Sequence, residues 1–382
     1  MKLAFCLFNY FPFGGLQRDF MRVATLALAK GHEIHVHTMD FVGDHPSAFV
    51  IHTYKPSFHV LQNHSRAYQF AQRIQDACKG KYDRVIGFNK MPGLDVYYAA
   101  DGCFKAKLSQ LNLPSLQSLL PRNKTYLALE EAVFGSSSHA QLVFIAKQNK
   151  IHYQHHYPLS SERQFLLPPG IDCSFQALPE KETVCQSLRQ QLGLQKQDIV
   201  LLMVASRFKT KGLDRAIKAI SSLPQSLQKH IQFIVIGNDD QKPFIRLANE
   251  LSVTAHINFV GAQENIAHWM QAADLLLHPA YYESAGLTLL EAIASGLPIL
   301  TTASCGYAEY VLNANAGKVV PDPYSQDCLN QILLALLLSP PDLKNYGVQA
   351  RRFAEQADFY NMPSAMLDMI ENWNKCNANS YT

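Results

Sequence analysis

Residues 278–292 read HPAYYESAGLTLLEA, and this stretch decides the fold. An apolar run over 275–279 leads into it, small residues follow, and an apolar pattern with helical spacing begins at Leu287. A strand, a short loop and a helix in that order form the βα unit of a parallel sheet. The free backbone amides at such a helix start attract phosphate and other anions, so the stretch predicts a ligand-binding edge.

Two glutamates separated by seven residues make this edge a candidate site for a sugar nucleotide. Glu283 is expected in the loop, where a carboxylate can accept hydrogen bonds from sugar hydroxyls. Glu291 is expected about two turns into the helix, where it can hold a ribose diol. The amides of Ala285, Gly286 and Leu287 are expected at the helix start, facing a diphosphate. The alternative for Glu291 is an ordinary solvent-exposed helical carboxylate.

Short apolar runs alternate with helix-length segments along the chain, which predicts parallel βαβ units in two series. The first series has apolar runs at 3–8, 33–38, 84–88 and 142–146. The second series has them at 199–205, 233–237, 257–260, 275–279 and 298–301. The expected fold class is therefore α/β, with two Rossmann-like, doubly wound domains.

The break between the two series is the stretch LLPPGID at 166–172, because consecutive prolines remove backbone donors and stop regular structure. The domains are therefore expected at 1–168 and 169–360. The tail at 361–382 has apolar residues at three- and four-residue spacing, which is typical of an amphipathic helix. We expect that helix to pack back on the first domain.

The first strand is followed by two glycines, Gly14 and Gly15, at the point where its helix begins. Glycine permits a left-handed backbone and close approach of a ligand, so this junction is a second candidate anion or sugar site. Asp19 is expected in the first turn of that helix. The alternatives are a tight turn without a ligand and a carboxylate that only complements the helix dipole.

The strand at 199–205 is followed by the loop SRFKTKG at 206–212 and then by a helix. Arg207 and Lys211 in this loop could contact the two phosphates of a nucleotide diphosphate and stabilise the leaving group without a metal ion. The alternative is that both cations are merely solvated.

Composition and charge limit the class of protein. The chain has 382 residues, of which 48% are hydrophobic and 17% charged, enough for two packed cores. A net charge of +3 is mild for a nucleic-acid binder, so no nucleic-acid partner is expected. The eight cysteines include no CxxC pair, which predicts neither a zinc site nor a disulfide framework. No signal peptide or membrane-spanning run is present in the sequence, so we expect a soluble or peripheral protein in the cytoplasm.

Together these residues resemble retaining glycosyltransferases of the GT-B fold, whose donor motif is Glu-x7-Glu. Glu283 and Glu291 fill that motif. The stretches FCLFNYFPFGGLQRDF at 5–20 and GFNKMPGLDVYYAAD at 87–101 are similar to lipopolysaccharide core glucosyltransferases, and the similarity covers nearly the whole chain. The resemblance implies a hexosyltransferase with its donor site in a cleft between the two domains.

The reaction that the resemblance implies is transfer of glucose from UDP-glucose to a heptose of the lipopolysaccharide inner core. The linkage would be α-1,3, formed with retention and with neither a metal ion nor another cofactor. Gly14, Gly15 and Asp19 would then face the donor.

Lys211 fits the family's phosphate lysine. The spacing from Arg207 to this lysine is one residue shorter than the commoner family pattern, so Lys209 is the alternative second phosphate cation.

Asp101 is the candidate acid or base by the same resemblance. It follows the apolar run at 96–100, at the end of an expected strand, where a carboxylate can orient an acceptor hydroxyl. The alternative is a structural cap before Gly102. No residue is an obvious nucleophile, so double displacement and front-face attack both stay open.

The segment 104–126 has four basic residues and no acidic one, which predicts contact with an anionic bilayer surface. The basic residues are Lys105, Lys107, Arg122 and Lys124, and the interleaved apolar residues are Phe104, Leu108, Leu111, Leu113, Leu116, Leu119 and Leu120. The alternative is a leucine-rich face packed in the core. A lipid-linked acceptor favours the membrane and would place the protein on the cytoplasmic face of the inner membrane.

Two other functions stay open at this point. A UDP-sugar epimerase on the same fold would keep the nucleotide and consume no acceptor. A non-catalytic nucleotide-sugar-binding protein is the other possibility, and the joint presence of Asp101, Lys211, Glu283 and Glu291 weakens it.

Overall fold

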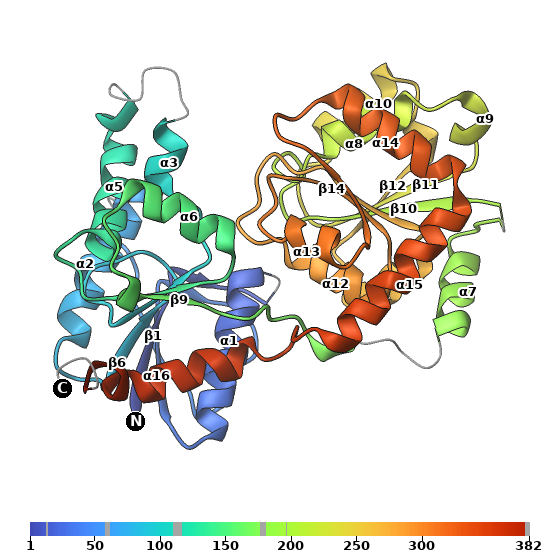
Figure 1. Ribbon diagram of the computed structural model, residues 1–382. Coiled ribbons are helices and arrows are strands. Elements are labelled where there is room, and N and C mark those ends of the chain that lie inside the picture. The colour runs from blue at the N-terminus through green and yellow to red at the C-terminus, as the bar shows by residue number, and fades with distance from the viewer. Residues whose placement is uncertain (13, 58–61, 110–116, 176–180, 196, 379–382) are drawn as a thin grey trace. The chain divides into compact units, whose positions relative to one another are not determined.

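The computed structural model describes the chain except for residues 13, 58–61, 110–116, 176–180, 196 and 379–382 (Figure 1). The chain forms two compact units. Unit 1 comprises Met1–Gly170 together with Asn361–Thr382, and unit 2 comprises Ile171–Tyr360. The chain first passes from unit 1 to unit 2 after Gly170. This point lies inside the stretch expected to be the linker and two residues beyond the expected boundary at 168.

Unit 1 is built on a seven-stranded parallel sheet with the strand order β5-β3-β1-β6-β7-β8-β9. Its strands are β1 (Lys2–Cys6), β3 (Glu33–Thr38), β5 (Val50–Thr53), β6 (Arg84–Gly87), β7 (Val96–Ala99), β8 (Gln141–Phe144) and β9 (Gln164–Leu166). Two short strands, β2 (Asn9–Tyr10) and β4 (Asp40–Phe41), pair in a separate parallel ladder. The five strands expected in this part of the chain, the four of the first series and the one before Asp101, are confirmed, with their ends shifted by at most two residues.

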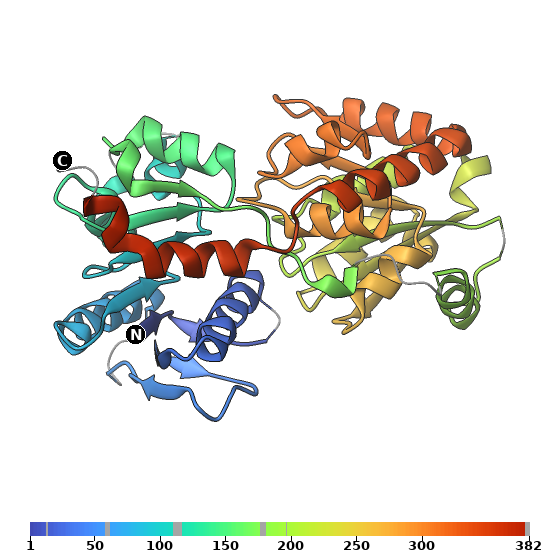
Figure 2. The same ribbon diagram turned by 60° about the horizontal axis from the view of Figure 1, so that its bottom comes forward.

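Helices form most of the connections in unit 1, but the segments that join β3 to β5 and β6 to β7, which the structure describes in full, contain no helix. The helices are α1 (Gly15–Ala29), α2 (Asn63–Cys78), α3 (Phe104–Ser109), α5 (Pro121–Phe134) and α6 (Lys147–His156), the 3-10 turn η1 (Ser161–Arg163), and the C-terminal α16 (Met362–Ala378). Helix α16 packs against α1, as Figures 1 and 2 show. Lys30 Nζ lies 3.0 Å from Asp368 Oδ1 and 3.3 Å from Glu371 Oε2, which ties the two segments together. The tail therefore returns to the first domain, as expected.

Unit 2 is built on a six-stranded parallel sheet with the strand order β12-β11-β10-β13-β14-β15. Its strands are β10 (Ile199–Val204), β11 (Ile231–Ile236), β12 (Ile257–Gly261), β13 (Leu275–His278), β14 (Ile299–Thr302) and β15 (Gly317–Val320). Strands such as β10 (IVLLMV) and β13 (LLLH) are nearly continuous apolar runs, because helices cover both faces of a parallel sheet. The five strands expected here are confirmed.

Helices connect these strands as the doubly wound pattern requires. They are α7 (Lys181–Gln191), α8 (Leu213–Ser221), α9 (Gln225–Gln228), α10 (Lys242–Glu250), α11 (Ile266–Ala272), α12 (Leu287–Ser295), α13 (Ala308–Asn313), α14 (Gln326–Leu338) and α15 (Pro340–Gln356), with the 3-10 turns η2 (Cys173–Phe175) and η3 (Thr254–His256). The expected architecture of two Rossmann-like units is thus confirmed.

Each sheet has one point at which the winding of the chain reverses. In unit 1 it lies between β1 and β6, and in unit 2 between β10 and β13. In open parallel sheets, ligands bind outside the carboxyl ends of the strands at such a switch point. The strand order therefore places one candidate ligand edge in each unit, beside the loops that follow β1 and β6 and beside those that follow β10 and β13.

Candidate active site

The candidate site of unit 2 begins where β13 ends at His278 and α12 starts at Leu287. Gly286 precedes the helix with a φ of 98°, a left-handed conformation that residues with a side chain rarely adopt. The helix starts where the sequence led us to expect it. The amides of Ala285, Gly286 and Leu287 accordingly lie at a helix N-terminus, which favours an anionic ligand.

The loop between β13 and α12 is braced by the neighbouring loop after β14. Glu283 N donates to Ser304 O at 3.1 Å, and Gly306 N donates to Glu283 O at 3.0 Å. Tyr307 N donates to Ala285 O at 2.7 Å. These bonds hold the backbone on both sides of the Glu283 side chain. The loop after β14 therefore fixes the point from which this carboxylate projects.

Three charged side chains meet at this edge of unit 2. Lys211, from the loop after β10, forms an ion pair with Glu283 Oε2. His278 Nε2 lies 3.0 Å from the same oxygen. The His278 ring is 0% exposed, and its Nδ1 has no hydrogen-bond partner among the described residues. Because β10 and β13 flank the switch point, the cluster lies where the topology places a ligand.

The cluster sets the charge of its members. Burial alone would raise the pKa of Glu283, but the hydrogen bond from His278 and the charge of Lys211 outweigh it and bring that pKa to about 2. Burial disfavours the charged form of His278, yet the adjacent Cys305 and Glu283 raise the pKa of the ring to about 9. At neutral pH the ionised carboxylate of Glu283 therefore lies between the Lys211 ammonium and a protonated His278 ring.

The two candidates for a second phosphate cation differ in their contacts. Lys209 Nζ donates to Asp214 Oδ2 at 2.7 Å and to Tyr281 OH at 3.2 Å, so its ammonium is already held by protein groups. Arg207 is exposed. The structure therefore favours Arg207 over Lys209 for this role, which stays a prediction.

Glu291 lies in α12, four residues after Leu287 and so little more than one turn into the helix. The expectation of two turns was wrong, because Glu291 is only the fifth residue of the helix that starts at Leu287. The residue is only 4% exposed. The alternative of an ordinary solvent-exposed carboxylate is therefore wrong as well, and contact with a ribose stays a prediction.

In unit 1, Gly14 is the N-cap of α1, and Gly15 is the first residue of that helix. The backbone of Gly14 is extended, with φ of −86° and ψ of 138°, so this glycine does not adopt the left-handed conformation that its residue type permits. A Cβ at this position would instead collide with the Gln17 side chain and approach the Phe11 ring at 2.9 Å. A side chain at this position would therefore need the Gln17 side chain to move and the Phe11 ring to shift.

Asp19 lies beyond the first turn of α1, so its expected place in that turn was wrong. Its side chain is buried, and Oδ2 accepts a hydrogen bond from Tyr98 OH at 2.8 Å. The other oxygen lies 3.8 Å from Arg22 Nη1. Asp19 therefore contacts side chains of unit 1, and its contact with a donor stays a prediction.

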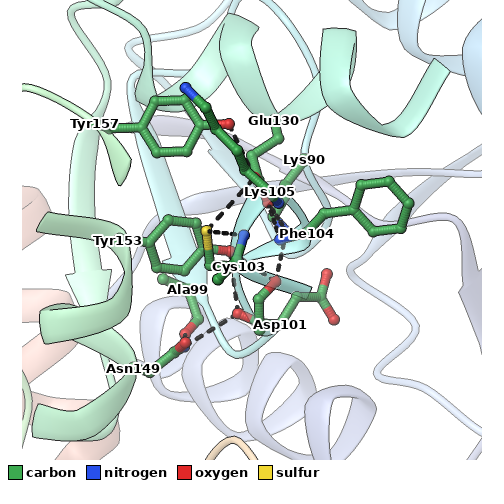
Figure 3. Close-up of polar contacts among 12 residues, drawn as sticks. Lys90, Ala99, Asp101, Cys103, Phe104, Lys105, Glu130, Asn149, Tyr153 and Tyr157 are labelled. Carbon is green, nitrogen blue, oxygen red and sulfur yellow. Dashed lines mark hydrogen bonds and ion pairs between the residues drawn. The ribbon is translucent and has the colours of Figure 1, made fainter. Parts of the chain in front are cut away.

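Asp101 follows β7 and is exposed. Its backbone oxygen accepts hydrogen bonds from Asn149 Nδ2 at 3.0 Å and from Tyr153 OH at 3.2 Å. Figure 3 shows the carboxylate pointing away from both of these side chains. The capping alternative is not supported, because the amides at the start of α3 donate to Glu130.

The basic segment is not one continuous helix. Lys105 lies in α3, where Nζ donates to His156 O at 3.1 Å and sits 4.7 Å from the centre of the Tyr157 ring. The ammonium of this lysine is therefore held against the end of α6. The remaining basic residues are exposed; they are Lys107 in α3, and Arg122 and Lys124 in α5.

Some apolar side chains of this segment are buried and others are exposed. Leu108 is buried, as the core alternative requires, whereas Leu119 and Leu120 are 59% and 50% exposed. The predicted positions Leu111, Leu113 and Leu116 lie outside the described residues. Among the described helices, none has the length and apolar character needed to cross a bilayer.

Three charged residues at the two sites were not predicted from the sequence. They are His278 beside Glu283 in unit 2, and Glu130 with its partner Lys90 near Asp101 in unit 1. His278 ends a strand, where parallel sheets present ligand-binding side chains, and that position could have marked it. Lys90 and Glu130 are 40 residues apart, and neither carries a comparable local signal.

Comparison with known proteins defines the class. The family model described as glycosyl transferases group 1 matches residues 185–353. The fold is shared with sucrose-phosphate synthase from Thermosynechococcus elongatus, with a TM-score of 0.78, 17% identity and 99% coverage of both chains. The molecule is a glycosyltransferase of the GT-B fold, which confirms both the expected fold class and the expected enzyme class.

A full-length relative gives a closer assignment. The chain is 42% identical to the lipopolysaccharide glucosyltransferase WaaG of Escherichia coli (strain K12) over 371 aligned residues. The alignment covers 97% of this chain and 98% of WaaG. A crystal structure of WaaG, a glycosyltransferase involved in lipopolysaccharide biosynthesis, aligns with a TM-score of 0.91, covering 96% of this chain and 99% of that one. The chain therefore belongs to the same family of group 1 glycosyltransferases as WaaG.

Proposed function

We propose that this glycosyltransferase moves glucose from UDP-glucose to a heptose of the lipopolysaccharide inner core, with retention and in an α-1,3 linkage. The observation that carries the proposal is the cluster of Lys211, Glu283 and His278 at the switch point of unit 2. An ammonium beside a helix N-terminus suits a diphosphate, and an ionised carboxylate within the cluster suits hexose hydroxyls. The similarity to WaaG supports the choice of glucose and of a lipopolysaccharide acceptor.

The charge arrangement gives each member of the cluster a role. When the donor binds, the ammonium of Lys211 exchanges its contact with Glu283 for the diphosphate. His278 remains hydrogen-bonded to the carboxylate, so a buried negative charge is not left uncompensated. The amides at the start of α12 and the guanidinium of Arg207 add to the positive field, and Glu291 takes the ribose. No metal ion is needed to neutralise the leaving UDP in this scheme.

The acceptor is assigned to unit 1. Asp101 is an exposed carboxylate at the carboxyl end of a parallel strand, where it can accept a hydrogen bond from the heptose hydroxyl. In the transfer, the bond between glucose C1 and the phosphate oxygen breaks, and the acceptor oxygen bonds to C1. The hydroxyl proton leaves toward a base, which is either this carboxylate or the departing phosphate.

We further propose that the protein works at the cytoplasmic face of the inner membrane. Exposed apolar and basic side chains occur together in the segment 104–126, which suits an anionic lipid surface. They are Leu119, Leu120, Lys107, Arg122 and Lys124. A lipid-anchored acceptor would be presented at that surface.

The proposal is tested by incubating the protein with UDP-[14C]glucose and a truncated lipopolysaccharide core that ends in heptose, with and without EDTA. The expected product is a labelled core with an α-1,3-linked glucose, formed at the same rate in both samples. A parallel incubation with UDP-[14C]galactose measures the selectivity for the donor hexose.

Other outcomes would contradict the proposal in distinct ways. Conversion of UDP-glucose into another UDP-hexose without the core would indicate an epimerase. Tight UDP binding without any turnover would indicate a binding protein. Transfer that stops in EDTA would contradict the metal-independent scheme alone.

A further inference from the structure

The backbone around Asp101 is held by side chains from three directions. Figure 3 shows Lys90, Glu130, Asn149, Tyr153 and Tyr157 gathered around residues 99–105. These side chains come from the loop after β6, from α5, and from α6 with the residue that follows it. None of them was part of the sequence prediction for this site.

Glu130 is the centre of this network. Its carboxylate is 0% exposed and is surrounded by donors. They are Lys90 Nζ at 2.8 Å, Phe104 N at 2.7 Å, Lys105 N at 2.9 Å and Tyr157 OH at 2.9 Å. Burial alone would raise the pKa of Glu130, but the charge of Lys90 and these hydrogen bonds lower it, so the carboxylate stays ionised.

The carbonyls on the other side of the segment are bound as well. Asn149 Nδ2 donates to Ala99 O and to Asp101 O, both at 3.0 Å. Tyr153 OH lies 3.2 Å from Asp101 O and 3.0 Å from Gly102 O. The ammonium of Lys90 donates to the same Gly102 oxygen at 3.0 Å, so one cation connects Glu130 to the backbone beside Asp101.

The arrangement leaves the Asp101 carboxylate exposed on a backbone whose neighbouring polar groups are occupied. Carbonyls 99, 101 and 102 and amides 104 and 105 all bind buried side chains. A buried ion pair is a weak way to stabilise a core, because desolvation of both charges offsets most of their attraction. A buried pair is well suited, however, to fixing one backbone geometry.

We infer that Lys90 and Glu130 are positioning residues that fix the Asp101 carboxylate for the acceptor hydroxyl. They touch neither substrate in this scheme and act only through the segment 99–105. The inference rests on the proposed function, because it needs Asp101 to take part in transfer.

The test is a double-mutant cycle between Glu130→Gln and Asp101→Asn. The amide in Glu130→Gln removes the charge that binds Lys90, so the segment loosens, and kcat at saturating acceptor should fall roughly ten- to hundredfold. In an Asp101→Asn background the same change should cost less than about twofold, since no carboxylate remains to be positioned. The Kd of UDP should stay within about twofold of the wild-type value in both backgrounds, because unit 2 is unchanged.

A matched control is available in Arg163, which donates to the carbonyls of Val133, Gly135 and Ala140 in the same unit. Arg163→Gln removes a half-buried cation whose hydrogen bonds go to backbone outside 99–105. It should change kcat by the same factor in the wild-type protein and in the Asp101→Asn background, so that the two effects multiply. If Glu130→Gln and Asp101→Asn also multiplied in this way, Glu130 would be structural only and the inference would be overturned.

A milder variant keeps the test sharp if Glu130→Gln does not fold. Tyr153→Phe removes two hydrogen bonds to the Asp101 and Gly102 carbonyls and keeps the ring stacked on Phe134 at 3.8 Å. This variant should lower kcat in the wild-type protein and should have little effect on kcat in the Asp101→Asn background. Absence of transfer by the wild-type protein would overturn the proposed function. Normal transfer by Asp101→Asn would overturn the role of Asp101 and with it the positioning role, but not the transfer of glucose.

Discussion

Lys211 and Glu283 form an ion pair although they lie in different loops, one after β10 and one after β13. The sequence assigned both residues to the donor, the lysine to a phosphate and the glutamate to the hexose. The ion pair brings these two residues into direct contact, and His278 is the second partner of the carboxylate. In the proposed donor complex, the diphosphate would replace Glu283 as the partner of Lys211, so the cation would not be taken from water.

The first prediction concerns the stability of unit 2 at different pH values. His278 has its pKa raised from 6.5 to about 9, so its contribution is complete below pH 6.5 and is lost as the pH rises through about 9. Glu283 has its pKa lowered from 4.5 to about 2, so its contribution is complete above pH 4.5 and is lost as the pH falls through about 2. Both contributions are complete between pH 4.5 and 6.5.

His278→Gln isolates the basic side of this profile. The wild-type free energy of unfolding should fall by at most about 3 kcal/mol more than that of the variant as the pH rises above 6.5. Urea unfolding followed by Trp269 fluorescence, in a Trp373→Phe background, reports on unit 2 because Trp269 lies in α11. Identical pH slopes for the two proteins would show that His278 is not charged in the folded state.

The second prediction separates Lys211 from Lys209. Lys211→Met should weaken UDP binding by about 1.5–3 kcal/mol, roughly ten- to hundredfold in Kd, because it removes a cation assigned to the diphosphate. Lys209→Met is the matched control and should change Kd less than about threefold, since its ammonium is held by Asp214 and Tyr281. Isothermal titration with UDP measures both values. Equal losses would show that Lys209 is a phosphate cation too.

The strands of the two cores could be predicted from the sequence because they are long apolar runs bounded by loops. The strands that the sequence did not reveal lie mostly at sheet edges: β5, β9 and β15. Residues of β5 and β9 are largely half-buried or exposed, so the apolar signal is weak there. Three of the four edge strands of the two large sheets therefore escaped a search that depends on burial of both faces, and only β12 was found by it.

The positions of individual candidate residues at strand ends could be predicted in the same way, but the contacts between them could not. Glu283 and Lys211 belong to local βα patterns, whereas their pairing depends on β10 lying next to β13. Glu130 is a charged residue with a fully buried side chain, which is rare without a partner, and that partner is 40 residues away. Such contacts are set by strand order and helix packing, which a linear pattern does not contain.

The third prediction concerns the membrane. Replacing Lys107, Arg122 and Lys124 together with Gln should weaken binding to vesicles of anionic phospholipid, at about 1 kcal/mol per charge. Lys105→Gln should have little effect, because that ammonium is bound to the His156 carbonyl and lies over the Tyr157 ring. Sedimentation with vesicles at low and physiological salt gives the partition coefficients. An undiminished partition coefficient of the triple variant would remove the interfacial assignment.

The last prediction divides the donor between the two glutamates of the Glu-x7-Glu motif. Glu283→Ala should depress turnover while UDP still binds, because UDP carries no hexose and the lost hydrogen bonds to a charged acceptor contribute about 1.5–3 kcal/mol. It also releases Lys211 from its ion pair, so UDP affinity should stay equal or rise. Glu291→Ala should instead weaken UDP and UDP-glucose alike, since both carry the ribose. Calorimetric titration of each ligand into each variant, with folding checked by circular dichroism, measures these losses directly. If Glu283→Ala weakened UDP as much as Glu291→Ala did, the two carboxylates would not divide the donor in this way.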